Sequence, residues 1–217
     1  MDAVLTEIPL AEALRYLGVR GEPDGILLAD LKRCAGLLLA KVRPRVCWRL
    51  FDLREDGTLA GTSFRPGGQD ICAHLEGCGR VIALAATLGM EAENLLQRAR
   101  LHAISDALLL DALGSAAVER LCDLLCEELA ARVAPEKLTA RFSPGYGDFP
   151  LSQQRELCEV LNVGRLLGIS LTSGDLMIPR KSVTALVGVS ASPAHAGAGK
   201  TAGCGSCAFS EIGRAHV

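Results

Sequence analysis

The chain has 217 residues, of which 49% are hydrophobic and 22% are charged, and its formal net charge is -2. This composition is typical of a folded globular protein, and the length allows one domain of ordinary size or two small ones. Because the charge is nearly balanced and only 4% of the residues are aromatic, the composition argues against nucleic acid or an anionic membrane surface as a partner.

The beginning of the chain has no basic stretch followed by an apolar run, so we expect no export signal. The longest uninterrupted apolar stretch, residues 81–88, is far too short to cross a bilayer. The number of cysteines is odd, at 9, and several lie among Leu and Val in helix-like segments, where a free thiol behaves as a small apolar group. We therefore expect a reduced, cytoplasmic protein that does not enter a membrane.

Hydrophobic patterning in the first part of the chain predicts two helices and three strands. In chain order these are a short strand over 4–8, a helix over 9–17, a helix over 23–41, and a hairpin with strands over 47–53 and 58–64. The limits of the first helix rest on Pro9 as its opening residue and on Gly18 as its stop. The turn of the hairpin is expected at Asp56-Gly57.

The rest of the chain is also predicted to contain both helices and strands. We expect a short helix capped by Asp70, a buried strand over 81–87, helical structure over 91–133 with a weak point at Gly114-Ser115, an extended segment over 138–143, a helix over 152–167 capped by Ser152, and a last strand over 183–189. The weak point makes 91–133 either two helices or one kinked helix. Helices and strands mix without strict alternation, which predicts an α+β domain over 1–190 with a mixed or antiparallel sheet.

The most informative segment, residues 141–150, reads Arg-Phe-Ser-Pro-Gly-Tyr-Gly-Asp-Phe-Pro. Pro144 fixes φ near the value needed at the second position of a β-turn, and Gly145 tolerates the positive φ of the third, so we expect a type II turn over 143–146. Such a turn leaves backbone groups free to face a ligand. It also holds Arg141, which suits a carboxylate, and Tyr146, which has a flat apolar face, on either side. On spacing alone, a surface turn with a solvated Arg141 fits better.

Arg-x-x-Pro-Gly-Tyr with a nearby Pro resembles the S-adenosylmethionine-binding signature of the activation domain of cobalamin-dependent methionine synthase. The resemblance extends over residues 7–190 and is closest to short, free-standing members of that family. It is carried by Arg15-Tyr16-Leu17-Gly18, Ala86-Thr87-Leu88-Gly89, the stretch 111–119, Leu171-Thr172, Met177, Pro179, Ser182-Val183 and Ser190. It implies the activation-domain fold.

The resemblance also implies roles for individual residues. Arg141 would hold the carboxylate of S-adenosylmethionine, and the backbone from Ser143 through Gly145 to Tyr146 would border the adenosyl part. Glu119 would face the cationic end of the ligand, either its amino group or its sulfonium, because a carboxylate beside a cation favours both charges. By helical periodicity alone, Glu119 would instead be a solvated residue.

Two departures from the family pattern bear on these roles. Leu186-Val187 stand where the long methionine synthases carry an aromatic pair, which affects how the chain would face a corrin. The N-terminal ligand-binding aspartate of the family has no counterpart, and Glu12 is merely the nearest acid.

The function implied is that of an accessory reactivation module for methionine biosynthesis. It would bind S-adenosylmethionine and dock on a cobalamin-bearing methionine synthase that lacks its own activation domain, with a flavodoxin- or ferredoxin-like protein supplying an electron. The module would need no catalytic residue of its own, because the sulfonium is already activated and the reduced cobalamin is the nucleophile. The absence of a recognisable catalytic constellation fits this role.

The end of the chain, after Ser190, reads as a tail rich in Ala, Gly and Ser over 191–210. Its Cys204-Gly205-Ser206-Cys207 has a metal-type spacing but supplies half a site. Free-standing family members carry further cysteine beyond such a pair, which implies zinc or an iron–sulfur cluster, whereas none follows here. A reduced tail without metal is the alternative.

Two other patterns in the tail resemble known sequences but do not indicate a function. Gly197-Ala198-Gly199-Lys200-Thr201 mimics a phosphate loop, but the required first glycine is Ala194 and no apolar strand precedes it. Residues 211–217 resemble a translated sequencing adapter and are interpreted as non-native.

A rival function uses the same tail. The chain would be a non-catalytic binding protein of a corrinoid system, with a metal centre at Cys204 and Cys207 as its working part. Binding of S-adenosylmethionine that depends on Arg141 would favour the first function, and tight metal binding without that ligand the second.

Overall fold

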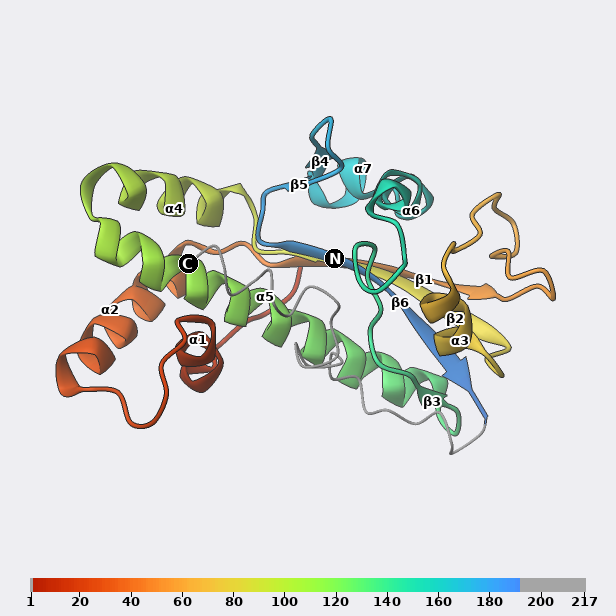
Figure 1. The fold of residues 1–217 in the computed structure, drawn as a ribbon, viewed down its shortest axis with the longest axis horizontal. Coiled ribbons are helices and arrows are strands. Elements are labelled where there is room, and N and C mark those ends of the chain that lie inside the picture. The colour runs from red at the N-terminus through yellow and green to blue at the C-terminus, as the bar shows by residue number, and fades with distance from the viewer. Residues whose placement is uncertain (1, 192–217) are drawn as a thin grey trace.

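A four-stranded sheet with helices on both faces forms the centre of the structure (Figure 1). The computed structural model describes residues 2–191. The strand order is β1-β2-β6-β3, with β1 at Arg45–Asp52, β2 at Arg80–Thr87, β6 at Ser182–Ser190 and β3 at Lys137–Leu138. All neighbouring strands are antiparallel, which confirms the α+β class in its antiparallel form.

The helices surround this sheet on both faces and at both ends. Figure 1 shows α1, α2 and α4 together at one end, α3 at the other end, and α6 and α7 on the opposite face from α5. Their bounds are Leu10–Tyr16 for α1, Gly25–Lys41 for α2, Gln69–Leu75 for α3, Met90–His102 for α4, Ile104–Val133 for α5, Gln154–Leu161 for α6 and Val163–Leu167 for α7. A small hairpin, β4 at Ser170–Leu171 and β5 at Met177–Ile178, precedes β6. Among residues 2–191, no helix combines the length and the apolar character needed to span a bilayer.

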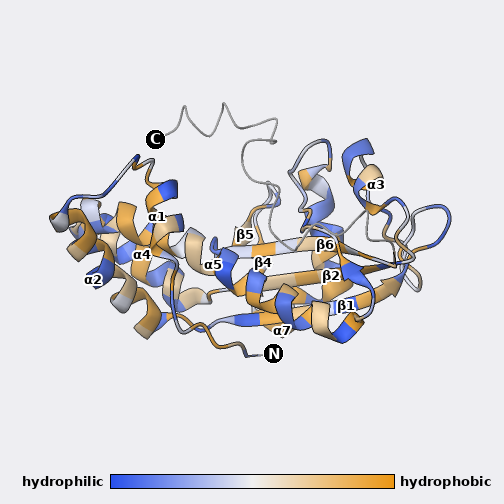
Figure 2. Ribbon diagram, turned by 90° about the horizontal axis from the view of Figure 1, so that it is seen from below, coloured by the Kyte–Doolittle hydropathy of each residue, from blue (hydrophilic) through white to orange (hydrophobic). Residues whose placement is uncertain are grey.

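The continuous apolar run of β2 reflects burial on both faces of the sheet. Because side chains alternate along a strand, Ile82 and Leu84 enter the core beneath α5, whereas Val81 and Ala83 enter the core beneath α6 and α7. Figure 2 shows β2 and β6 largely in the orange of hydrophobic residues.

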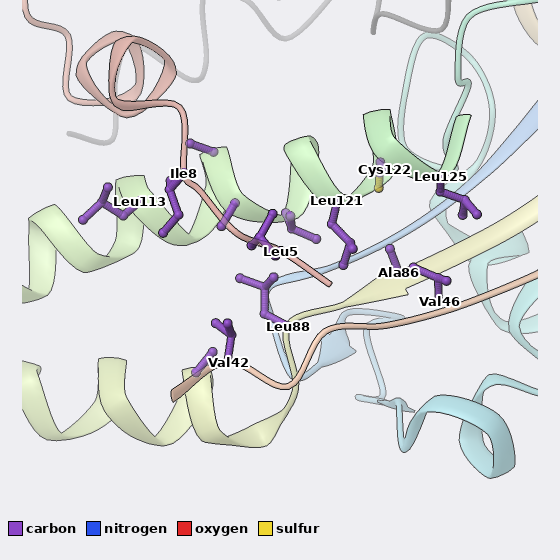
Figure 3. Packing of buried hydrophobic residues seen from close by; sticks show 14 of the residues in the cluster. Leu5, Ile8, Val42, Val46, Ala86, Leu88, Leu113, Leu121, Cys122 and Leu125 are labelled. Atoms are coloured by element: carbon purple, nitrogen blue, oxygen red, sulfur yellow. The ribbon is translucent and has the colours of Figure 1, made fainter. Parts of the chain in front are cut away.

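Helix α5 is the longest element and crosses the sheet with one apolar face inward. Figure 3 shows Leu121, Cys122 and Leu125 of α5 pointing toward Val46 of β1 and Ala86 of β2. All five side chains are buried. A row of half-buried polar residues runs along another side of α5, and this row belongs to the site described below.

The break in the long helical segment lies at Ala103 rather than at Gly114-Ser115. Ala103 has extended torsions, with φ of -154° and ψ of 86°, and separates α4 from α5. Gly114 lies inside α5, where a Cβ would meet the Lys181 side chain at 3.0–3.3 Å. The glycine therefore admits a crossing side chain and does not end a helix.

Two predicted strands are also wrong. Residues 4–8 form no strand, although Leu5 and Ile8 are buried in the core, and the pairing there is a single bridge between Asp2 and Arg45. The returning strand over 58–64 reduces to one bridge, Leu53 to Leu59. Both segments bury apolar side chains without forming a ladder, so their hydrophobic pattern was ambiguous.

The expected helix caps differ as well. Asp70 lies inside α3, and the carboxylate of Asp148 caps this helix by accepting hydrogen bonds from the N–H groups of Gln69 (2.6 Å) and Asp70 (3.0 Å). Ser152 lies within a short 3-10 turn at Leu151–Gln153, ahead of α6. Asn162, in the left-handed region, divides the predicted helix over 152–167 into α6 and α7.

We expect Asp148→Ala to lower the free energy of unfolding by about 0.5–2 kcal/mol, the usual value of an N-cap, because two N–H groups of α3 lose their acceptor. Chemical denaturation monitored by circular dichroism measures this change. Glu55→Ala is the matched control, since Glu55 is exposed and should change stability by less than about 0.5 kcal/mol. Equal stability of both variants would contradict the capping role.

Candidate functional site

The Pro-Gly turn predicted from the sequence is present. The N–H of Tyr146 donates to the carbonyl of Ser143 at 3.1 Å, and Gly145 has φ of 91°, the value that a type II turn requires at its third position. Two further hydrogen bonds, from Gly145 to Phe149 (2.8 Å) and from Phe149 to Tyr146 (2.9 Å), close the segment on itself. Several of the backbone groups expected to face a ligand are therefore engaged within the segment.

Two contacts from outside anchor this segment to α3 and the preceding loop. Asp70 accepts a hydrogen bond from the N–H of Asp148, while Asp148 caps α3 in return. Gln153 accepts from the N–H of Gly67 at 2.6 Å and donates to the carbonyl of Arg65 at 2.9 Å. The turn is thus held in a fixed position by long-range contacts.

The side chain of Arg141 is buried, with 2% of its surface exposed, and is not solvated as the spacing alone favoured. Its Nη2 donates to Oε2 of Glu119 at 2.8 Å, and its Nη1 donates to Oδ1 of Asp123 at 2.7 Å. Nη1 also lies 3.8 Å from the sulfur of Cys126. The extended residues before the turn pair with β6 through Phe142 and Leu186, so the backbone that carries the guanidinium belongs to the sheet.

Glu119 and Asp123 come from successive turns of α5. Residues four apart on a helix lie on the same side, so the half-buried residues Asp111, Ser115, Glu119 and Asp123 form one polar row, which we call the polar seam. The side chains of Glu119 and Asp123 remain 27% and 37% exposed, so each can meet a ligand while contacting Arg141.

The electrostatics of this cluster keep the guanidinium charged. Burial works against the charge, the hydrogen bond to Asp123 and the attraction of Glu119 act in the opposite direction, and the pKa of Arg141 is raised above its ordinary value. Burial raises the pKa of the Cys122 thiol and of the Cys126 thiol, so both are neutral near pH 7. With two carboxylates and one guanidinium, the cluster carries one net negative charge.

The remaining predicted residues lie in the turn that follows Arg141 in the chain. Tyr146 is 41% exposed and Gly145 is exposed, while Ser143 is half-buried. The structure thus brings Arg141 and Glu119 into direct contact, with the exposed turn a few residues further along the chain. This arrangement can present hydrogen-bond donors, carboxylates and an aromatic face to one small molecule.

Two residues near the site were missed from the sequence. Asp123 could have been found from its four-residue spacing to Glu119, since both are acidic on one face of α5. The contact of His74 is the second: its Nε2 lies 2.8 Å from the carbonyl of Ala140 and 2.9 Å from Oγ1 of Thr139. No local signal in the sequence predicts that contact, because the partners are 65 and 66 positions away.

The predicted metal ligands Cys204 and Cys207, with the rest of the tail and residues 211–217, lie outside the described residues. Within 2–191, no group of three or more His, Cys, Asp or Glu side chains is arranged to hold a metal ion. The rival function with its metal centre therefore stays a prediction.

Comparison with known proteins supports the assignment of the fold. No protein-family model matches the sequence, and no curated protein matches it. Among solved structures, the chain is similar to the crystal structure of the MetH reactivation domain bound to AdoHcy, with a TM-score of 0.61 and 17% sequence identity. The similarity covers 87% of this chain and 77% of that chain. At this identity the likeness concerns the fold, and this chain has the fold of that reactivation domain.

Proposed function

We propose that the chain is an S-adenosylmethionine-binding reactivation module that supports the reductive methylation of cobalamin in a partner methionine synthase. The observation that carries the proposal is the buried guanidinium of Arg141, held against Glu119 and Asp123 beside the exposed Pro-Gly turn. The similar solved structure holds AdoHcy, the demethylated form of the proposed ligand, and so supports this ligand class.

The amino-acid end of S-adenosylmethionine is a zwitterion, which can replace an existing ion pair by two new ones. Glu119 now contacts Nη2 of Arg141. When the ligand binds, its carboxylate takes this place on Arg141, and Glu119 turns to the ligand's cationic end, whether amino group or sulfonium. Asp123 keeps its contact with Nη1, so the guanidinium remains paired throughout. The exposed ring of Tyr146 then borders the ligand on the side of the turn.

The residues of this chain position the methyl donor and supply no nucleophile. Cobalamin on the partner would supply the nucleophile after reduction by a flavodoxin- or ferredoxin-like protein, and transfer of the methyl group from the sulfonium to it would leave S-adenosylhomocysteine on this chain. The partner would be a cytoplasmic methionine synthase without its own activation domain. The fixed turn and the sheet-borne Arg141 serve this task, because catalysis by positioning depends on holding reactants in one geometry.

We expect Arg141→Lys to weaken S-adenosylmethionine binding by about 1.5–3 kcal/mol, because lysine keeps the charge but loses the planar fork that pairs with a carboxylate. Isothermal calorimetry measures the change, and thermal unfolding establishes that the variant is folded. Arg155→Lys is the matched control, since Arg155 is half exposed and pairs with Asp175 at the surface. Wild-type protein that binds no S-adenosylmethionine would refute the proposed function.

We expect Glu119→Gln to weaken S-adenosylmethionine binding by at least about 1 kcal/mol, because a charged hydrogen-bond acceptor is lost. Comparison with S-adenosylhomocysteine, which lacks the sulfonium, identifies the group that Glu119 faces. Equal losses for both ligands indicate the amino group, and a loss confined to S-adenosylmethionine indicates the sulfonium.

Glu127→Gln is the control for this experiment. It removes the same charge from α5, but Glu127 is exposed and pairs with Arg120. An equal effect of both substitutions would show that only the overall charge of the helix matters.

A further inference from the structure

A second basic side chain lies on the polar seam, one helical turn before Glu119. Lys181 directly precedes β6, and 11% of its side chain is exposed. Its Nζ donates to Oγ of Ser115 at 2.9 Å and lies 3.2 Å from Oδ2 of Asp111. The aliphatic part of the side chain crosses α5 at Gly114, where any Cβ would meet it at 3.0–3.3 Å.

The position of Lys181 relative to Glu119 follows from the geometry of α5. Ser115 and Glu119 are four residues apart, so their Cβ atoms lie about 5–6 Å from each other on the same side of the helix. The Lys181 ammonium, which contacts Ser115, is thus one helical turn away from the Glu119 carboxylate, which contacts Arg141. A ligand whose amino-acid end lies at Arg141 and Glu119 reaches Ser115 and Lys181 if its remainder follows the seam.

The ammonium has hydrogen-bonding capacity beyond its present contacts. An ammonium has three N–H donors, and the acceptors close to Lys181 within residues 2–191 are those of Ser115 and Asp111. Asp111 does not depend on Lys181 for charge balance, because Arg100 and Arg180 lie 3.8 and 3.7 Å from its Oδ1. A third donor of Lys181 remains for an oxygen or a ring nitrogen of a ligand.

We infer that Lys181 and Ser115 form a second contact point of the same site, which takes the nucleoside part of an S-adenosyl compound. The inference rests on the proposed function for the identity of the ligand. Arg141 and Glu119 bind the charged amino-acid end, whereas Lys181 and Ser115 donate to the hydroxyl groups or ring nitrogens of the nucleoside. Asp111 lies beside Lys181, and Glu93 lies 3.5 Å from Arg180, so these two carboxylates offset two of the three positive charges of Lys181, Arg100 and Arg180.

The protonation behaviour of Lys181 agrees with this role. Burial disfavours the charged amine and lowers the pKa of Lys181 below its ordinary value, although Asp111 opposes this effect. An ammonium that is poorly solvated gains more from a ligand acceptor than a fully hydrated one does.

The test compares three ligands on two site variants. S-adenosylmethionine contains both ends, methionine contains only the amino-acid end, and 5′-methylthioadenosine contains only the nucleoside. We expect Lys181→Met to weaken S-adenosylmethionine and 5′-methylthioadenosine by about ten- to a hundredfold and to leave methionine unchanged. Arg141→Lys should show the opposite preference, weakening methionine but not 5′-methylthioadenosine.

Lys181→Met is suited to this test because methionine keeps an unbranched side chain over Gly114. Lys32→Met, an exposed lysine on α2, is the matched control and should bind all three ligands as the wild type does. If Lys181→Met does not fold, Ser115→Ala decides, with an expected loss of several-fold for the two nucleoside ligands.

The outcomes separate this inference from the proposed function. If Arg141→Lys loses S-adenosylmethionine while Lys181→Met or Ser115→Ala binds it as tightly as the wild type, the second contact point is wrong and the proposed function stands. If the wild type binds none of the three ligands, both are wrong.

Discussion

The candidate site depends on one buried guanidinium with a carboxylate on each of its two terminal nitrogens. Loss of both carboxylates would leave a buried guanidinium without a counter-charge, and loss of Arg141 would leave two half-buried carboxylates side by side, which is why such clusters are costly to break even where they add little to stability. Arg141 belongs to backbone paired with β6, and Glu119 and Asp123 belong to α5. Their contact therefore fixes the distance between helix and sheet edge at the place where the Pro-Gly turn begins, and it places the three candidate ligand-binding groups together.

Helix α5 can hold these carboxylates in place because one of its sides packs on the sheet and another carries the polar seam. Leu121 and Leu125 pack on the sheet, so the helix cannot rotate or slide without exposing apolar surface. Cys122 and Cys126, next to the ion pairs, are kept uncharged by burial and form the boundary between core and seam. The rigidity of the polar seam is thus provided by the hydrophobic core beneath it, and the seam itself consists of residues that would be ordinary on a solvated helix.

The parts of the structure that could be predicted from sequence are those determined locally. The turn at Pro144 and Gly145 follows from the torsions that these residues allow, and β2 follows from an apolar run too short for a helix. The role of Gly114 depends on Lys181, which lies far along the chain, and no Gly or Pro marks the break at Ala103. In the site, Arg141 and Glu119 were identified through a resemblance. Their direct contact, the contact of Asp123 with Arg141 and the contact of Lys181 with the polar seam could be found only from the folded structure.

The charge of the cluster has a consequence for the proposed reaction. Glu119, Asp123 and Arg141 together carry one negative charge, and S-adenosylmethionine, with a carboxylate, an amino group and a sulfonium, carries one positive charge. Loss of the methyl group removes the sulfonium charge, so the product is neutral overall and is attracted less strongly. Because the carboxylates are only partly exposed, water screens this difference less than it would at the surface. On this proposal, the same pairing that selects the methyl donor also favours release of the demethylated product, and return of Glu119 to Arg141 restores the ion pair of the free protein.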